Sequence, residues 1–445
     1  MVALTFYGGV NEIGGNKILL EDKGARIFLD FGQSFTLLDD YFLEEAYLSP
    51  RDRFGLRDYF ALGLMPKLKG LYNKDSIGRT DLGFSKPEFD GVFISHAHAD
   101  HVAHLGYLHP EIPIYLGECT KMILDSVQVT AKSGDYFSDE NRVEPFRTGK
   151  QLKVGPLTVH PVHVDHSVPG AYGYIVETSE GAVAYTGDIR RHGPRADMTQ
   201  EFVEKAASFD PVALIIEGTR VQPEEKRAHF TEEMVYNESL KAALWTKGLV
   251  MAMRYPRDLD RFRTFYEIAR KAGRELVIST KTAHLLTALK CDPKLGLPDP
   301  LKDSRIKIYN RQLDRPGKWE APFLAESVTS DYVHKNQKKI ILELDFYHLA
   351  ELVDIKPEHG CCIHSMSEPF EEDPVSSMGD GVLTNWMTLF GMPRHQFHAS
   401  GHASRSEIFA MVGEIGAKKV FPVHTMCPEL FKGAEKIEKG KKIML

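Results

Sequence analysis

Ser95-His96-Ala97-His98-Ala99-Asp100-His101 places three histidines and an aspartate within seven residues. The apolar run of residues 92–94 in front of it predicts a buried strand, so the cluster stands where this strand ends and the chain turns into a helix. Histidines two residues apart on such a turn can share one metal ion, and the Asp100–His101 pair can face a second. Imidazole and carboxylate groups without thiolates indicate an open catalytic site for Zn²⁺ or Mn²⁺.

Other predicted strands end in polar residues that can reach the same place. Apolar runs predict strands at residues 157–163, 171–177, 182–186 and 212–216. His166 lies just beyond the first of these strands, Asp188 just beyond the third and Glu217 just beyond the last. His160 and His163 are close enough to His166 in sequence to compete with it for a place in the site.

The chain before residue 95 contains two regions with different sequence patterns. Short apolar runs at 4–6, 17–20 and 25–30, separated by glycines, predict an antiparallel sheet with tight turns. Residues 34–90 mix aromatic and charged side chains without a clear period. A connection of this length is either a lid or binding element, or an ordered surface insertion without function. The sequence leaves both open.

After Gly218 helical and extended patterns alternate. Helices are predicted at 232–246 and 259–272, and strands at 249–253, 276–278, 339–344 and 361–364. Such alternation implies parallel strands joined by crossovers, so this region should form an α/β domain of its own. Its arginines at 254 and 257–263 are expected either to face a nucleic-acid strand or to lie on a solvated helix face.

Bulk properties limit the class of protein. A single core rarely exceeds ~250–300 residues, so a chain of 445 residues should form two domains. A net charge of -7 argues against a passive polycationic coat for nucleic acid, but a polyanionic substrate is compatible if metal ions supply positive charge. Five cysteines without a C-x-x-C pair argue against a disulfide framework, and no run approaches the ~18 apolar residues of a membrane span. We expect a soluble, cytoplasmic protein that does not enter the membrane.

The 95–101 stretch resembles the signature motif of the metallo-β-lactamase superfamily, in which a later histidine and aspartate complete the site. The resemblance implies an α/β fold built as an αββα sandwich. It also implies two divalent metal ions, with Zn²⁺ favoured and Mn²⁺ as the alternative. One ion would be held by His96, His98, His166 and Asp188, and the other by Asp100, His101 and a bridging Asp188. Two ions on one carboxylate would activate a bridging water as hydroxide and clamp an attacked phosphate.

Two late motifs resemble those of the β-CASP nucleases, the subgroup of this superfamily that acts on nucleic acids. They are His398-Ala399-Ser400-Gly401-His402-Ala403 and Phe421-Pro422-Val423-His424-Thr425, and Ile215-Ile216-Glu217-Gly218-Thr219 stands at the subgroup's acidic motif. The opening stretch at 8–16 and the overall pattern resemble the ribonuclease J family. The resemblance implies that residues 1–218 and 395–445 form the metallo-β-lactamase domain and that residues 219–394 are an inserted α/β β-CASP domain.

The resemblance also assigns roles to individual residues. His424 would complete the ligands of the second metal ion. Ser400 and His402 would bind the scissile phosphate, with His402 stabilising charge or protonating the leaving oxygen. Glu217 would orient a ligand histidine through its ring N–H. The expected catalytic residues are Asp100, His402 and Glu217.

The sequence also departs from the family pattern. The usual Gly-Ser-Gln run of the inserted domain is missing, and the segment 361–368 stands near its place. His364 in that segment is expected to be structural. The chain stops at Leu445, where many ribonuclease J proteins carry a further domain, which leaves homodimer formation and the preference for RNA ends open.

The leading hypothesis is a metal-dependent phosphodiesterase that hydrolyses single-stranded RNA. Degradation from the 5′ end is one mode of action that this hypothesis includes. The family associates a histidine at the position of His424 with RNA, and an aliphatic residue with DNA. A DNA nuclease with the same site, a small-molecule metallo-hydrolase of the same fold and a non-catalytic RNA-binding scaffold are the alternatives.

Overall fold

The computed structural model describes residues 1–42, 48–131, 136–137, 142–224, 229–367 and 374–445. The chain divides into two compact units. Unit 1 comprises Met1–Leu124, Lys132–Arg227 and Gly401–Leu445, and unit 2 comprises Asp125–Ala131 and Ala228–Ser400. Unit 1 is therefore assembled from segments that are far apart in the sequence.

The first sheet of unit 1 has seven strands within the described part of the chain. Their order is β19 (Lys442–Met444), β1 (Ala3–Gly8), β2 (Lys17–Asp22), β3 (Ala25–Leu29), β4 (Gly91–Ile94), β5 (Ile114–Gly117) and β6 (Val143–Phe146). Pairing is antiparallel from β19 to β3, which confirms the predicted N-terminal antiparallel sheet, and parallel from β3 to β6. The edge strand β19 was not predicted.

The second sheet of unit 1 follows the order β18 (Lys419–Val423), β11 (Ala213–Glu217), β10 (Gly181–Tyr185), β9 (Tyr172–Thr178), β8 (Leu157–His163) and β7 (Leu152–Val154). Strands β10, β11 and β18 are mutually parallel, whereas β9 runs antiparallel to both β8 and β10. Strands β8, β10, β11 and β18 consequently all end at the same edge of the sheet.

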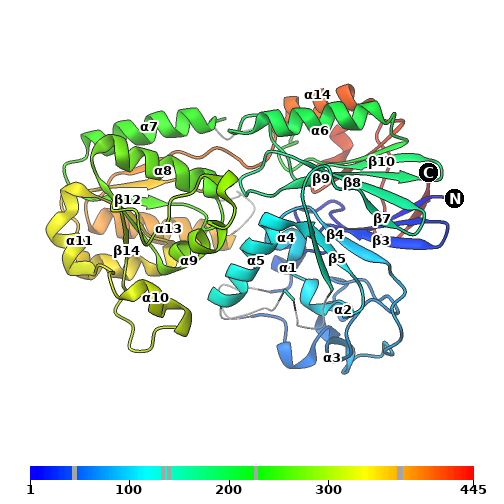
Figure 1. Ribbon diagram of the computed structural model, residues 1–445, viewed down its shortest axis with the longest axis horizontal. Coiled ribbons are helices and arrows are strands. Elements are labelled where there is room, and N and C mark those ends of the chain that lie inside the picture. Colours follow the sequence, from blue (N-terminus) through cyan, green and yellow to red (C-terminus); the bar gives the residue numbers. More distant parts are fainter. Residues whose placement is uncertain (43–47, 132–135, 138–141, 225–228, 368–373) are drawn as a thin grey trace. The chain divides into compact units, whose positions relative to one another are not determined.

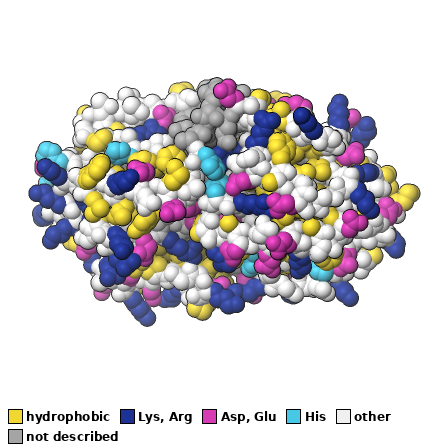
Figure 2. Space-filling view, turned by 90° about the horizontal axis from the view of Figure 1, so that it is seen from above, with side chains coloured by type: hydrophobic (Ala, Val, Ile, Leu, Met, Phe, Trp, Pro, Cys, Tyr) yellow, Lys and Arg dark blue, Asp and Glu magenta, His cyan; other side chains and the backbone are white. Residues whose placement is uncertain are grey.

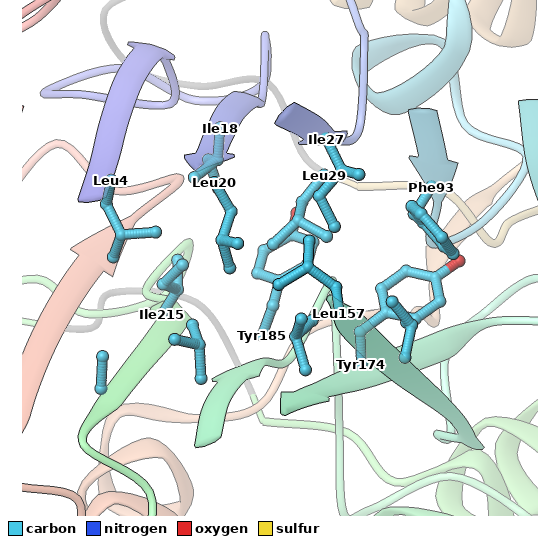
Figure 3. Close-up of a cluster of buried hydrophobic side chains, with 14 of the residues drawn as sticks. Leu4, Ile18, Leu20, Ile27, Leu29, Phe93, Leu157, Tyr174, Tyr185 and Ile215 are labelled. Carbon is cyan, nitrogen blue, oxygen red and sulfur yellow. The ribbon is translucent and has the colours of Figure 1, made fainter. Parts of the chain in front are cut away.

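The two sheets of unit 1 pack face to face (Figure 3). Leu4, Leu20 and Phe93 of the first sheet meet Tyr174 and Tyr185 of the second, and all five side chains are buried. Full burial of a large apolar side chain contributes about 1.5–3 kcal/mol. Helices α6 (Ala196–Ser208) and α14 (Arg405–Ile415) cover the outer face of the second sheet, and α4 (Ala99–Val102) and α5 (Glu118–Thr130) lie beside the first (Figure 1). The predicted αββα sandwich is confirmed.

The 34–90 segment is a packed part of unit 1. Its described residues form α1 (Phe35–Asp39), a 3₁₀ turn η1 (Asp52–Phe54), α2 (Arg57–Ala61) and α3 (Lys74–Ile77). The Tyr59 ring lies 5.4 Å from that of His104 and 5.8 Å from that of Tyr107, which joins α2 to the chain just after α4. Residues 43–47 lie outside the described residues.

Unit 2 is built on an all-parallel sheet, as the alternation of helix and strand predicts. Its order is β14 (Ile306–Ile308), β13 (Glu275–Ile278), β15 (Ile340–Glu343), β12 (Val250–Met253), β16 (Cys361–His364) and β17 (Arg394–Gln396). Helix α8 (Leu259–Ala272) begins where the Asp258 side chain accepts a hydrogen bond from Arg261 N, and ends at Gly273, whose φ of 64° suits glycine.

The prediction for two arginines of unit 2 was wrong. Arg254 is buried and pairs with Glu343 at 2.6 Å. Arg261 is buried as well and pairs with Glu232 at 3.0 Å. Neither guanidinium lies on a solvated helix face or is available to a nucleic-acid strand, because each already satisfies a carboxylate inside the unit.

The surface carries charges of both signs. Lys and Arg side chains alternate with Asp and Glu over the face shown in Figure 2. The five cysteines, all within the described residues, form no disulfide bond with one another. No helix among the described residues is long and apolar enough to span a bilayer.

Candidate metal centre

The predicted ligands stand at strand ends of unit 1. His96 and His98 follow β4, and Asp100 and His101 lie in the one-turn helix α4. Three more ligands come shortly after a strand: His166 after β8, Asp188 after β10 and His424 after β18. Glu217 is the last residue of β11. These four strands end at one edge of the second sheet, so the topology alone brings side chains from distant parts of the sequence together.

The first group of possible ligand atoms comes from His96, His98, His166 and Asp188. The Nδ1 atom of His98 lies 3.0 Å from Nε2 of His96 and 3.0 Å from Nε2 of His166. Two imidazole nitrogens on one tetrahedral zinc ion are about 3.3 Å apart, so these spacings fit a shared ion. Burial, and then neighbouring imidazoles, hold the pKa of His96 and His166 well below the usual value, which keeps both rings neutral and able to bind metal.

The second group comes from Asp100, His101, His424 and again Asp188. His424 Nε2 lies 2.8 Å from an Asp100 carboxylate oxygen, and His101 Nε2 lies 3.1 Å from an Asp188 oxygen. Asp188 is the one residue common to both groups, so a single carboxylate could contribute to the binding of two ions. The resemblance to the metallo-β-lactamase superfamily implies a bridging ligand at this residue.

The polar atoms around Asp188 test whether these residues fit a metal ion. The side chain is 1% exposed, and neither carboxylate oxygen makes a hydrogen bond among the described residues. Nε2 of His101 likewise has no hydrogen-bond partner there. A buried carboxylate without hydrogen bonds costs several kcal/mol unless it is paired or coordinates a cation. The donor set therefore fits divalent metal binding.

Oxygen atoms behind the histidines fix which ring nitrogen faces the site. His101 Nδ1–H donates to Asp30 at 2.7 Å, and His166 Nδ1–H donates to the carbonyl of Gly401 at 2.6 Å. His96 Nδ1 lies 3.0 Å from Ser95 Oγ, and His424 Nδ1 lies 2.9 Å from Thr219 Oγ1. Each of these rings thus turns Nε2 inward, and such outer partners raise the basicity of the ligand nitrogen. These roles of Asp30, Ser95 and Thr219 depend on the fold and were not predicted from the sequence.

Close backbone packing keeps the metal-binding turns in place. A Cβ atom on Gly32 would stand 1.7 Å from the carbonyl oxygen of Asp100, so no other residue fits there without moving the turn. Gly187, directly before Asp188, has a φ of 56°, which suits glycine, and a Cβ atom there would stand 2.8 Å from Cβ of Ser95.

Substitution of Asp30 by asparagine is expected to weaken metal binding about 10- to 100-fold. The Asp30 carboxylate accepts hydrogen bonds from Ser95, His101 and Tyr185, and an amide group would present N–H atoms to some of these donors. Competition with a chromogenic chelator measures the change. As a control, Asp22→Asn alters another buried carboxylate, bonded to Ser179, and should leave metal affinity unchanged. Equal affinity of the Asp30 variant and the unmodified protein would contradict the assigned role.

Glu217 and His402 form a pair beside the two groups. His402 Nδ1 lies 3.0 Å from Glu217 Oε2, and Thr219 Oγ1 donates to the same oxygen at 2.6 Å. Burial opposes charge on His402, but the carboxylates of Glu217 and Asp188 outweigh it and raise the pKa of the ring to about 9. Glu217 therefore contacts His402 directly and reaches His424 through Thr219.

The remaining predicted residues fall into two classes. Ser400 is half-buried and is the last residue of unit 2, so its contact with substrate stays a prediction. His160 and His163, which competed with His166 in sequence, are bonded elsewhere, to Glu177 at 2.6 Å and to Thr148 at 2.6 Å. His364 bonds Gln396 at 2.6 Å inside unit 2, as expected for a structural histidine.

Two stretches of the chain that contain site residues match known protein families. Residues 81–247 match a family described as a beta-lactamase superfamily domain, and residues 392–445 match a family described as a Zn-dependent metallo-hydrolase RNA specificity domain. The first range includes the 95–101 stretch, His166, Asp188 and Glu217, and the second includes His402 and His424.

Relatives named ribonuclease J resemble most of the chain. The protein from Pyrococcus abyssi is 23% identical over 95% of this chain and 90% of its own length. The protein from Sinorhizobium meliloti is 24% identical over 77% of this chain, and the match covers 59% of that relative. A crystal structure titled as a protein of unknown function from Enterococcus faecalis V583 is 24% identical, with a TM-score of 0.78 and full coverage of both chains. That likeness supports the fold.

Proposed function

Because this chain belongs to the metallo-β-lactamase superfamily and is of the β-CASP type, similar to ribonuclease J, we propose that it is a metal-dependent nuclease acting on single-stranded RNA. The observation that carries the proposal is the sharing of the buried Asp188 carboxylate by two groups of histidine and carboxylate ligands. Two adjacent cations suit in-line displacement at a phosphodiester, since they stabilise both the attacking and the leaving oxygen.

Two divalent ions would be held by the two groups described above, with zinc favoured by the nitrogen-rich donor set. When bound, they would supply a nucleophile at neutral pH and neutralise charge on the attacked phosphate. The chain's own side chains would orient the reaction. Asp30, Ser95 and Thr219 hold the ligand rings in one orientation.

His402 is the proposed group for the phosphate and the leaving oxygen. Its Nδ1 is turned toward Glu217, so Nε2 is the ring atom that would donate a hydrogen bond to substrate. Glu217 acts through His402 and Thr219 and is a positioning residue in this scheme. Ser400 would add a second donor to the phosphate.

Three observations favour RNA over DNA. The family that matches residues 392–445 is described by RNA specificity, and the relatives that match most of the chain are named ribonuclease J. His424, which the resemblance associates with RNA substrates, lies within the second group of ligands. A DNA nuclease with the same site is the second candidate.

The test is hydrolysis of 5′-labelled single-stranded RNA and DNA of matched sequence, with Zn²⁺ or Mn²⁺ added. RNA should be cleaved faster, and mononucleotides released from the 5′ end would establish the exonuclease mode. His98→Ala should abolish cleavage because it removes a predicted ligand. His163→Gln, which changes a histidine outside the ligand groups, should retain it. Faster cleavage of DNA would select the second candidate, and turnover of a lactone or thioester without any cleavage of oligonucleotides would refute a nuclease.

A further inference from the structure

Four arginines surround one aromatic ring in the 34–90 segment. The guanidinium carbons of Arg51, Arg53, Arg57 and Arg79 lie 4.4, 4.8, 5.5 and 5.5 Å from the centre of the Phe54 ring. They come from the neighbourhoods of η1, α2 and α3, labelled in part in Figure 1. We call these five residues the Phe54 cluster.

The backbone brings the parts of the Phe54 cluster together. Leu56 N donates to the carbonyl of Ser76 at 2.8 Å, which ties the start of α2 to α3. Leu56 and Ile77 are buried beneath the cluster's segments. The arginines therefore stand on a packed base rather than on a loose loop.

The four arginines of the cluster differ in how closely carboxylates contact them. Arg51 makes a two-pronged bond to Asp58, at 2.6 and 2.9 Å, and this contact lowers the pKa of Asp58 to about 2. Arg53, Arg57 and Arg79 are exposed and make neither an ion pair nor a side-chain hydrogen bond among the described residues. Three like charges around one ring repel one another, in a chain whose net charge is -7. An anionic partner would relieve that repulsion.

The geometry of the cluster suits phosphate groups. A guanidinium held against an aromatic ring loses less conformational entropy when it binds, and its N–H edges remain available for two-pronged bonds to phosphate oxygens. Several such groups at fixed spacing fit a chain of phosphates better than a single small anion. Single-stranded nucleic acid is bound in this way, by positive side chains interleaved with aromatic rings.

We propose that the Phe54 cluster is a second RNA-binding surface, which holds the phosphates of a single strand outside the metal centre. The proposal rests on the proposed function for the identity of the strand. The cluster is also joined to the metal-binding turn within unit 1, because Tyr59 of α2 packs on His104 and Tyr107, and Asn73 N donates to the Tyr107 carbonyl at 2.9 Å. A long RNA held there gains effective concentration at the site, whereas a short one does not.

The binding test uses the full chain, stripped of metal so that RNA is not cleaved, and a single-stranded RNA of about 30 nucleotides, longer than one typical binding surface. Fluorescence anisotropy over a range of salt concentrations compares the unmodified protein with the triple variant R53Q/R57Q/R79Q. The variant should bind about tenfold or more weakly at low salt, and its slope of log K against log salt should be smaller by about 2, since each phosphate contact on a single strand contributes about 0.7.

A matched control removes the same amount of charge elsewhere. The variant R142Q/R195Q/R270Q changes three arginines that are each paired with a nearby carboxylate, and it should bind RNA with the unmodified slope. Phe54→Leu keeps every charge but removes the ring, and should show part of the loss. Equal affinity and slope for R53Q/R57Q/R79Q and the unmodified protein would overturn the proposal, even if that variant lost binding to vesicles of anionic lipid.

Hydrolysis of bis(p-nitrophenyl) phosphate by the metal-loaded proteins distinguishes a failure of the second RNA-binding surface from a failure of the proposed nuclease function. This small diester should be cleaved equally by the unmodified protein and R53Q/R57Q/R79Q, because it does not extend to the cluster. Retained hydrolysis with unchanged RNA binding in the variant refutes the second surface alone. Absence of diester and RNA hydrolysis from the fully metal-loaded unmodified protein refutes the proposed function, and with it the assignment of the strand.

Discussion

Replacement of Asp188 by asparagine is expected to lower phosphodiester hydrolysis at least about a thousandfold, equivalent to ~4 kcal/mol of transition-state stabilisation. Both groups of ligands depend on this one carboxylate, so the substitution alters two ion positions at once. An amide can offer only one oxygen, and its nitrogen would face imidazole Nε2 atoms that lie 3.1 to 4.0 Å from the present oxygens. The protein should therefore retain fewer than two ions.

Metal analysis by mass spectrometry, together with RNA hydrolysis at rising metal concentration, measures this result. Asp30→Asn provides the graded comparison, because it leaves every proposed ligand in place and should regain activity when metal is in excess. Asp188→Asn should not regain it. Thermal unfolding in a chelator should be similar for the two variants, which shows that both are folded. Two bound ions and near-normal activity in Asp188→Asn would disprove the bridging assignment.

Removal of the metal ions by a chelator is expected to abolish hydrolysis and to destabilise unit 1. An ion that binds only the folded state stabilises it by about 4 kcal/mol at a free concentration of ~1,000 times Kd. For a unit of this size, that loss lowers Tm by about 10 °C. Hydrolysis should return on addition of Zn²⁺ or Mn²⁺.

Hydrogen exchange locates this effect within the chain. After chelation, backbone amides at the ends of β4, β8, β10 and β18 should exchange faster, because these strands carry the proposed ligands. The strands of unit 2 provide an internal control, since all three groups of possible ligands found in the described part of the chain lie in unit 1. Protection that falls equally in both units, or in neither, would contradict a metal centre confined to unit 1.

The sequence predicts those parts of the fold whose signal is local. The apolar run before His96, and the polar residues that follow later strands, predicted both the strands and the convergence of His166, Asp188 and Glu217, whereas the place of His424 was implied by the resemblance to the β-CASP nucleases. Alternation of helix and strand after Gly218 predicted the parallel sheet of unit 2. In each case the prediction depends on residues that are close together in the sequence. The spacing of apolar side chains and the residues at turns reflect the local backbone conformation.

Features that depend on distant partners were not predicted. Asp30 ends a strand like many other aspartates, and only the fold shows that it meets Ser95, His101 and Tyr185. Arg261 lies at the start of an amphipathic helix, where arginine is usually solvated, but Glu232 from another helix reaches it in the interior of unit 2. The edge strand β19 is short and polar, and gains its extended form from pairing with β1. Contacts between residues that are far apart in the sequence produce no local pattern of apolar side chains from which they could be predicted.

The discontinuous course of unit 1 also bears on how the protein is made. Asp100 and His424 are separated by 324 residues, and the strand that delivers His424 pairs with β11 only after all of unit 2 has been synthesised. At roughly 5–20 residues per second, a ribosome needs tens of seconds to cover that interval. A nascent chain would lack the complete set of proposed ligands until the segment that carries His424 emerges, so it could not yet hold both ions of the proposed metal centre.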